Sequence, residues 1–507
     1  MLTGRRWAAL AVLSGALALI SLDNTIVNVA LPSLQEDLDA TTAQLQWVVD
    51  AYSVLFAGTL LLAGALGDRF GRRRVLLVGL VVFGSGSLAA GMVSDASALT
   101  LCRAVMGVGG AFIMPSTLSI LVQVFRDPRE RAQAIGIWAA VAGVGVALGP
   151  IIGGLLLERF SWQAIFLVNP PLIVVVLVAA ILFVPESRDP DRPRLDMRGA
   201  ALSSLGLIAL VVTIIELPES GLDARTLTTG GVAVGALALF VWWERRAPRP
   251  LLPMELFRQR TFVVAVVTVG LVYFALMGAM FLLPQFLQLV QSMSPLESGV
   301  AMLPGAGGLL VASLVSPAVA YRLGTRATVV TGLVLVLMGM ALSSLYRVDT
   351  AYPFIALTLG LIGVGMGLAL PQATNAVLAS VPRERSGMGS AVNDAVGELG
   401  GSFGVAILGA LMSVFYRERI QAAIASLGDR AAEVPSDVLD AVQESLASAA
   451  LVATRLPDVY AAVVHEATGT AFVAGMTWAL LLGSVVVAGG VVLAWLMFPR
   501  QIERVEE

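Results

Sequence analysis

Residues 44–74 read QLQWVVDAYSVLFAGTLLLAGALGDRFGRRR, an apolar run of helical length that stops at a loop of glycine and arginine. A helix needs about 20 apolar residues to cross the hydrocarbon core of a bilayer. The part before the loop, 44–66, meets that length with Asp50 as its one charged residue. Glycines then allow a tight turn, and three arginines follow in a row. This stretch predicts a transmembrane helix that ends in a short basic loop.

Similar apolar runs fill most of the chain. Of its 507 residues 57% are hydrophobic and 13% charged, whereas soluble domains carry about 25% charged residues. The runs are much longer than barrel strands, and backbone groups in lipid must be paired within the segment, so we expect helices. The sequence predicts an all-α polytopic membrane protein of the fourteen-helix kind, with spans near 6–30, 44–66, 75–93, 98–122, 132–156, 164–184, 199–217, 227–244, 261–284, 298–320, 327–346, 353–378, 388–415 and 469–497.

The arginines indicate which loops lie inside the cell. The chain has 32 basic residues, and all of them are arginine because it contains no lysine. If the amino terminus is cytoplasmic, 24 of the 32 fall on the cytoplasmic side and seven on the outer side. This asymmetry is the positive-inside signal of membrane proteins. It predicts a multi-pass protein of the plasma membrane with both termini in the cytoplasm.

Two cytoplasmic loops rich in proline and arginine, 185–198 and 245–260, divide the spans into groups of six, two and six. We expect an amino-terminal six-helix bundle at 1–184, a linker with two inserted transmembrane helices at 185–260, and a carboxy-terminal six-helix bundle at 261–507. The last bundle carries an external loop, 416–468. Apolar residues at helical spacing predict a short amphipathic helix within 436–452 of that loop.

Three strings of residues carry a more specific signal. The first is the Gly64–Arg74 loop, and the second is a glycine-rich stretch of the fifth span, where small residues let helices approach closely and a proline permits a bend. The third is Leu22–Pro32. Together with Trp47–Tyr52, Ser161–Trp162, Asn169–Pro171, Pro284–Gln288 and Ser390–Gly404, they resemble the 14-span drug/proton antiporter family of the major facilitator superfamily, over essentially the whole chain.

The resemblance implies roles for these strings. The Gly64–Arg74 loop resembles a cytoplasmic latch between two bundles, formed by Gly64, Gly67, Asp68, Arg69, Gly71 and Arg72. The glycine-rich stretch resembles the packing motif of exporters, with Gly145, Gly149, Pro150, Gly153 and Gly154. The stretch Leu101–Gly110 is similar to the motif whose arginine, here Arg103, serves proton coupling. Met106 departs from that motif, because the family often has a glutamine there.

Five ionisable residues lie inside predicted spans: Asp23, Asp50, Arg103, Asp394 and Glu398. Such residues are costly in lipid and usually face a cavity. From the helical rise, Asp23, Asp50 and Arg103 all lie within about 10 Å of the outer ends of their spans. We therefore expect one local network of three charges, in which Arg103 keeps a carboxylate ionised.

Asp394 and Glu398 are four residues apart, so they share a helix face nearer the middle of the bilayer. Two neighbouring carboxylates suit the uptake of a proton on one side and its release on the other. With all five residues ionised the cavity would carry a charge of −3, which favours cations over anions. Structural alternatives remain open: a hydrogen-bond node for Asp23, a hydrated interfacial position for Asp50, an ion-pair role for Arg103, and bridging between helices for the other two.

Uncharged candidates for the cavity lining are Asn28, Tyr52, Trp138, Tyr273, Gln372 and Asn375. For the aromatic residues the alternative is packing against lipid or other helices. The sequence has no P-loop string, and its single histidine and single cysteine are too few for a zinc or haem site. We therefore expect no enzyme activity, no metal, no cofactor and no nucleotide or nucleic-acid partner.

These observations predict a proton-coupled secondary transporter that exports small amphipathic, cationic drugs or toxic compounds by alternating-access antiport. Its partners are the small-molecule substrate, protons and the lipid bilayer. One alternative is a dedicated exporter of one endogenous metabolite or antibiotic. A remote alternative is a non-transporting membrane sensor or lipid-organising protein, which has no evident use for five buried charges.

Overall fold

The computed structural model describes residues 3–191, 195–426, 436–444, 446–453 and 458–501. Within these ranges the regular structure is entirely helical, without strands. Fourteen helices of the described residues are long and apolar enough to cross a membrane. The predicted fold class, an all-α polytopic membrane protein with two six-helix bundles and an inserted pair, is thereby confirmed.

The amino-terminal bundle contributes six spans. The predicted sixth span is split at Val168, because Pro170 and Pro171 follow and proline is accommodated at the start of a helix. Its helices are α1 (Thr3–Leu38), α2 (Thr42–Phe70), α3 (Arg72–Ala90), α4 (Ala96–Val124), α5 (Pro128–Leu157), α6 (Ala164–Leu167) and α7 (Asn169–Phe183).

The inserted pair consists of α8 (Met197–Ser220) and α9 (Ala224–Glu244). Asp196 joins the two helices at one end: its carboxylate caps α8 by accepting from the Gly199 amide at 2.9 Å, and it accepts from the Trp243 indole at 2.7 Å. Val211 of α8 packs with Val54 and Ala57 of α2, and Leu399 of α15 joins the same cluster. Helix α8 therefore contacts both bundles.

The carboxy-terminal bundle also has breaks at prolines and longer helices than hydropathy predicts. Met302 separates α11 from α12, just before Pro304. Its elements are η1 (Met254–Arg258), α10 (Arg260–Gln285), η2 (Phe286–Val290), α11 (Pro295–Ala301), α12 (Leu303–Leu323), α13 (Thr325–Ser343), α14 (Tyr352–Ala379), η3 (Arg383–Arg385), α15 (Ser386–Ser426), α16 (Ser436–Glu444), α17 (Leu446–Ala453) and α18 (Asp458–Met497).

Much of the predicted external loop is helical. Helices α15 and α18 run on past the predicted spans 388–415 and 469–497, and α16 and α17 pack against them. The Tyr416 hydroxyl of α15 donates to the Val442 carbonyl of α16 at 2.9 Å. The amphipathic helix predicted within 436–452 is therefore present as the pair α16 and α17, with residue 445 outside the described residues.

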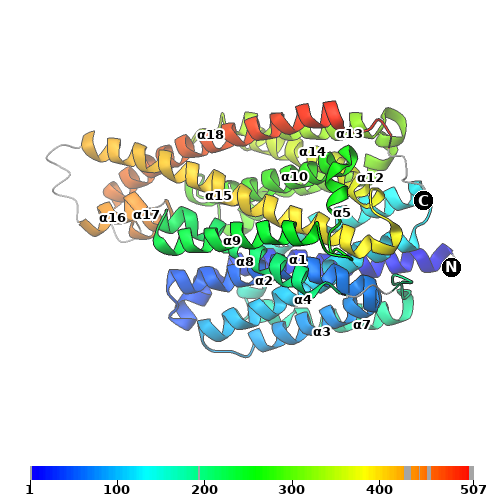
Figure 1. Ribbon diagram of the computed structural model, residues 1–507. Helices are drawn as coiled ribbons and strands as arrows, with labels where there is room; N and C mark the ends of the chain where they lie inside the picture. The colour runs from blue at the N-terminus through cyan, green and yellow to red at the C-terminus, as the bar shows by residue number, and fades with distance from the viewer. Residues whose placement is uncertain (1–2, 192–194, 427–435, 445, 454–457, 502–507) are drawn as a thin grey trace.

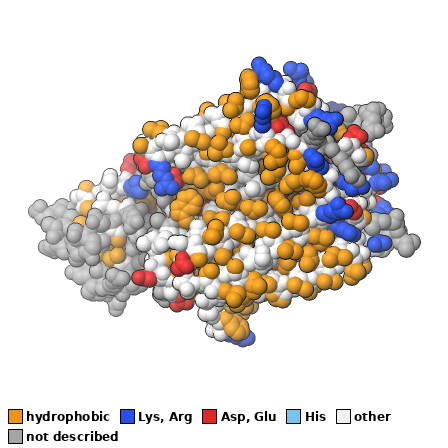
Figure 2. Space-filling view, turned by 60° about the horizontal axis from the view of Figure 1, so that its bottom comes forward, with side chains coloured by type: hydrophobic (Ala, Val, Ile, Leu, Met, Phe, Trp, Pro, Cys, Tyr) orange, Lys and Arg blue, Asp and Glu red, His pale blue; other side chains and the backbone are white. Residues whose placement is uncertain are grey.

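The molecule is elongated along its helices. Helix α1 begins and α18 ends at the same end, which we call the base, while α16 and α17 lie at the opposite end, the top (Figure 1). One face carries a broad band of hydrophobic side chains, with arginines gathered at its margins (Figure 2). The two bundles meet along two seams, one between α2 and α15 and the other between α5 and α12.

Candidate functional site

A buried ion pair lies within the amino-terminal bundle. Arg103 of α4 donates through Nη1 to Asp23 Oδ2 of α1 at 2.5 Å, and both residues are almost completely buried. Asn169, the first residue of α7, donates to the other carboxylate oxygen at 2.9 Å. Asp23 is therefore held by a cation and an amide from two other helices, as a buried carboxylate requires.

Arg103 is also held by α2. Its Nε donates to the Val48 carbonyl at 3.2 Å, and its guanidinium carbon lies 4.5 Å from the centre of the Tyr52 ring. Asp50 lies on the same helix and is half-buried. Of the three charges expected to form one network, the structure joins Asp23 and Arg103 directly.

The second pair of acids lies on α15. Asp394 is buried; its Oδ1 accepts from the Asn393 amide at 3.1 Å, and its Oδ2 has no hydrogen-bond partner among the described residues. Glu398 is half-buried, with the side chain of Ser53 of α2 beside it. The ring of Tyr273 from α10 packs on Gly397, 3.1 Å from where a Cβ would lie. These acids thus lie where α15 meets α2 and α10.

Most of the uncharged lining candidates are enclosed in this conformation. Tyr52 and Trp138 are buried, and the Trp138 indole donates to Thr117 at 3.1 Å. Gln372 donates to Ser316 at 3.1 Å within the carboxy-terminal bundle. Asn375 accepts from Arg131 Nε at 3.1 Å, which joins the two bundles. Asn28 is exposed and Tyr273 is half-buried, so lining by the four buried residues stays a prediction for another conformation.

The latch residues meet the opposite bundle at the base of the α2–α15 seam. Asp68 accepts from the backbone amides of Gly387 at 2.9 Å and Met388 at 3.0 Å, which are the second and third residues of α15. Arg72 donates to Asp68 at 2.7 Å and to the Glu384 carbonyl at 2.6 Å. An acid at a helix amino terminus satisfies free amides and the positive end of the helix dipole. Asp68 is therefore a cap supplied by one bundle to the other.

The latch glycines serve different needs. A Cβ on Gly64 would lie 2.7 Å from Ala391 Cβ, so that position requires glycine for the seam to close. Gly71 has a φ of 117°, a backbone conformation that only glycine adopts easily. A Cβ on Gly67 would make only an ordinary contact, at 3.6 Å from Arg72 Cγ. Arg69 stacks on Phe70 with its guanidinium carbon 5.1 Å from the ring centre.

The glycine-rich stretch of α5 packs against α1, with one exception. Cβ atoms on Gly145, Gly149 and Gly153 would each approach α1 to 3.0 Å or less, at Ser21, Thr25 and Ile26. Pro150 lies beside Gly299 of α11, across the interface between the bundles. A Cβ on Gly154 would have no described atom within 4 Å, so close packing at that glycine is not found.

The sequence profile of the Major Facilitator Superfamily matches residues 13–405, most of the chain. The chain belongs to this superfamily. It is 36% identical to the multidrug efflux pump LfrA of Mycolicibacterium smegmatis, over 98% of this chain and 97% of that protein. It is 33% identical to the tetracenomycin C resistance and export protein of Streptomyces glaucescens, over 99% and 93%. It is also 33% identical to the methyl viologen resistance protein SmvA of Salmonella typhimurium, over 92% and 93%.

A solved facilitator shares the fold. The human organic anion transporter MFSD10 (TETRAN) superposes with a TM-score of 0.61, covering 95% of this chain and 99% of its own, at 15% identity. That identity is low enough that the likeness concerns the fold alone. The family assignment makes the chain a multi-pass membrane transporter.

Several cross-bundle contacts of this facilitator were missed by sequence reasoning. Gln123 of α4 donates to the Arg383 carbonyl at 2.5 Å, and Arg383 Nη2 donates to the Arg126 carbonyl at 2.9 Å. In the second seam Arg129 donates to the Tyr321 hydroxyl at 3.0 Å and stacks on its ring. These partners are roughly 200 residues or more apart, and no local pattern pairs them. Both seams are therefore closed at the base in this conformation.

One further site residue, Asn169, carried a signal that could have been read. Besides Asp23 it contacts the Ser87 hydroxyl at 3.1 Å, and Ser87 in turn donates to the Phe166 carbonyl at 2.8 Å. An asparagine just before a proline pair inside an apolar run is a polar residue that must find partners. That argument singles out Asn169 as a polar node of the bundle.

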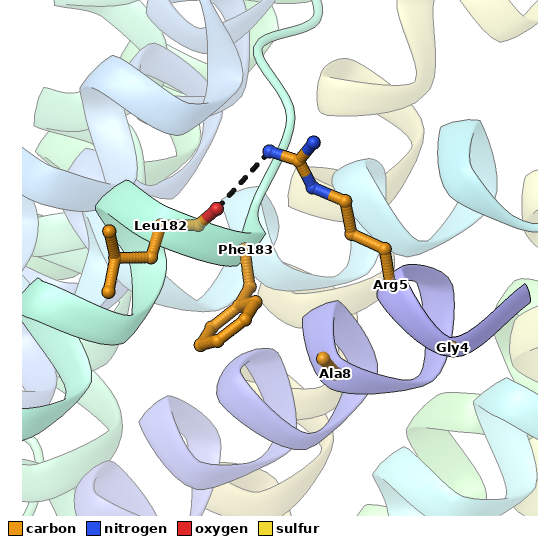
Figure 3. A pocket seen from close by; sticks show the side chains of 5 residues that line it. All are labelled: Gly4, Arg5, Ala8, Leu182 and Phe183. Atoms are coloured by element: carbon orange, nitrogen blue, oxygen red, sulfur yellow. Dashed lines mark hydrogen bonds between the residues drawn. The ribbon is translucent and has the colours of Figure 1, made fainter. Parts of the chain in front are cut away.

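A surface hollow of about 480 Å³ lies away from these charges, between α1 and α7 at the base. Figure 3 shows Arg5 reaching over it to the Leu182 carbonyl, 3.2 Å away, with Phe183 and Ala8 on its wall. Arg5 precedes Asp23 by 18 residues of one helix, or about 27 Å along its axis. The hollow is therefore separate from the buried acids.

Proposed function

We propose that this facilitator is a proton-coupled exporter of small amphipathic drugs, with a preference for cations. The observation that carries the proposal is Asp394, which is buried and has one carboxylate oxygen without a hydrogen-bond partner among the described residues. Burial of such a group is costly unless a ligand brings it a proton or a positive charge. Glu398, one helical turn further along, offers a second acid at the same place.

The names of the relatives support export of drugs. They refer to multidrug efflux, to tetracenomycin C and to methyl viologen, and methyl viologen is an organic dication. A carboxylate that receives either a proton or a cationic drug provides antiport directly, since one ligand must leave before the other binds. Asp23, Asp50 and Arg103 form the amino-terminal part of the proposed coupling site, and Asp394 and Glu398 the carboxy-terminal part.

We also propose an orientation in the plasma membrane, with the base and both termini in the cytoplasm. The distribution of arginines supports it, because 24 of 32 then lie on that side. One hydrophobic core is built mainly from residues 9–184 and the other mainly from residues 251–498, which supports an amino-terminal bundle at 1–184 and a carboxy-terminal bundle at 261–507. Several buried residues of the proposed linker, 185–260, belong to the second core. In this orientation the described state is closed to the cytoplasm. The exposed Asn24 and Asn28, within the α1 span, support a water-filled space on the outer side.

The test is proton release from proteoliposomes of the purified protein, followed with a pH dye under a gradient that is acidic inside. Lipophilic cations should trigger proton movement in the native protein. Asp23→Asn, Asp394→Asn and Glu398→Gln should each abolish it while the protein stays folded. Glu216→Gln is a matched control, because Glu216 pairs with Arg225 at 2.8 Å near the end of α8. Normal coupled transport in all three variants would remove the mechanism.

A dedicated exporter is the second candidate, and the name of one relative favours it. The Streptomyces glaucescens protein is named for resistance to, and export of, a single compound, tetracenomycin C. A panel of unrelated cationic dyes and neutral drugs distinguishes the two. Responses to many members support a multidrug exporter, and a response to one compound alone supports the dedicated one.

A further inference from the structure

Helix α2 passes between the two groups of charged residues, Asp23 with Arg103 on one side and Asp394 with Glu398 on the other. Two consecutive residues of α2 face them: Tyr52 lies under Arg103, and the side chain of Ser53 lies beside Glu398. Neighbouring side chains on a helix point about 100° apart, so one helix can touch both groups at the same level. A displacement of α2 therefore changes both contacts together.

Tyr52 packs against one face of α4. Arg103, Gly107 and Gly110 follow at intervals of four and three residues, which places them on the same face. Arg103 covers the ring, a Cβ on Gly107 would lie 3.1 Å from Tyr52 Cα, and a Cβ on Gly110 would lie 2.6 Å from its hydroxyl. Two glycines thus make room for a tyrosine whose ring faces an arginine.

The ring face, and not the hydroxyl, makes the polar contact of Tyr52. The side chain is 1% exposed, and its hydroxyl has no hydrogen-bond partner among the described residues, although Asn24 approaches it. A guanidinium over an aromatic face is attracted by the ring quadrupole, most strongly away from water. Of the three groups that hold Arg103, the Asp23 carboxylate can be neutralised by a proton, while the Val48 carbonyl and the Tyr52 ring cannot.

We infer that Tyr52 is a positioning residue for proton coupling: its ring, together with the Val48 carbonyl, keeps Arg103 attached to α2 when Asp23 takes up a proton. Loss of the ion pair then shifts α4 and α2 relative to α1, and α2 carries the shift to Ser53 and Glu398. The inference rests on the proposed function. It adds an element, the aromatic face on α2, through which the state of one acid reaches the other.

The experiment replaces Tyr52 by phenylalanine and by 3,4,5-trifluorophenylalanine in the full chain, using encoded non-natural amino acids. Phenylalanine keeps the ring quadrupole, whereas three fluorines remove most of it at nearly constant shape. The readout is the number of protons released per molecule of lipophilic cation bound, in proteoliposomes. We expect the phenylalanine variant to stay within about twofold of the native protein and the trifluoro variant to fall by about fivefold to tenfold.

Phe56 provides the matched control. It lies one turn further along α2, is nearly as buried as Tyr52, and stacks on it with ring centres 5.7 Å apart. The arginine, however, stacks on Tyr52. Trifluorophenylalanine at position 56 should leave coupling unchanged. Equal coupling in the phenylalanine and trifluoro variants at position 52, or an equal loss at position 56, overturns the inference. Asp394→Asn is measured in the same assay. If this variant also couples normally, the proposed function itself is wrong; if it loses coupling, a negative result at position 52 contradicts only the inference about Tyr52.

Discussion

The α2–α3 turn of the amino-terminal bundle and the α12–α13 turn of the carboxy-terminal bundle have the same backbone plan. Each is centred on a glycine with positive φ, 117° at Gly71 and 87° at Gly324. The next amide donates to the segment that follows the last span of the same bundle: Arg72 to the Ser187 carbonyl and Thr325 to the Arg500 carbonyl, each at 2.9 Å. The two turns are therefore structural repeats.

They differ three residues before the glycine, where one turn has Asp68 and the other Tyr321. Asp68 caps the start of α15 across the seam, at Gly387 and Met388. Tyr321 meets Arg129 at the start of α5, but α5 is capped by its own Asp127, which accepts from two backbone amides at 2.9 and 3.0 Å. At the α2–α15 seam the helix cap therefore comes from the opposite bundle, whereas at the α5–α12 seam it comes from the same bundle. The difference predicts that the base opens at unequal cost along the two seams.

Removal of the shared cap should have the largest effect. Asp68→Ala leaves Arg72 buried without its carboxylate and two amides of α15 without an acceptor. Breaking a buried pair in this way costs about 3–5 kcal/mol, and the two lost amide contacts are the ones that cross the seam, so the closed base should be weakened. Spin labels on cysteines introduced at positions 74 and 385, in a Cys102→Ser background, should report a longer distance. An unchanged distance distribution would show that the cap does not hold the seam.

A methyl group added at the same seam should also open the base, by less than the loss of the cap. Gly64→Ala places a methyl group 2.7 Å from Ala391 Cβ, closer than atoms can pack. Overpacking of this kind costs about 1–3 kcal/mol and should again favour the open base. Gly154→Ala is the control, since nothing lies within 4 Å of its Cβ position. The same label pair should lengthen for the first variant alone, and equal shifts in both would count against the interpretation.

At the second seam the corresponding loss should be slight. Tyr321→Ala removes the hydrogen bond and the stacking contact of Arg129, whose guanidinium carbon lies 4.3 Å from the ring centre. Tyr321 is 67% exposed, so the contact is worth about 0.5–1 kcal/mol. Coupled transport should stay within about fivefold of the native rate. A lengthening of the distance between labels at positions 74 and 385 as large as that expected for Asp68→Ala would make the two seams equivalent.

The smallest effect concerns Asp127 and depends on pH. The backbone amides of Glu130 and Arg129 hold the pKa of this exposed carboxyl below its usual value. Its stabilising contribution is therefore present above about pH 4, the pKa in an unfolded chain, and is lost as the pH falls through the lowered folded value. Asp127→Ala should lower the Tm slightly at neutral pH. That difference should vanish in strong acid, whereas a difference independent of pH would exclude capping as its cause.

The sequence was sufficient for the spans and for placing Asp23, Asp50 and Arg103 at a similar depth, because hydropathy and depth along a helix are local quantities. It left open which carboxylate Arg103 holds, and the structure pairs it with Asp23. It was insufficient for the contacts that join the bundles, such as Arg131 with Asn375, since these depend on how helices distant in the chain are placed. The spans predicted for α15 and α18 were also too short, because the outer turns of these helices are polar and carry no hydropathy signal. Gln372 and Trp138 were predicted to line the cavity but have partners within their own bundles.

Helix α15 is 41 residues long without a proline, or about 60 Å, roughly twice the thickness of the hydrocarbon core. It carries the capped residues Gly387 and Met388 at the base, the acids at positions 394 and 398 further along, and Tyr416 under α16 at the top (Figure 1). Such a rod acts as a lever. A tilt of about ten degrees about its middle moves each tip by about 5 Å. In the proposed orientation α16 and α17 lie outside the cell, so a binder that clamps them should stop the proposed transport cycle without reaching the acids at positions 394 and 398.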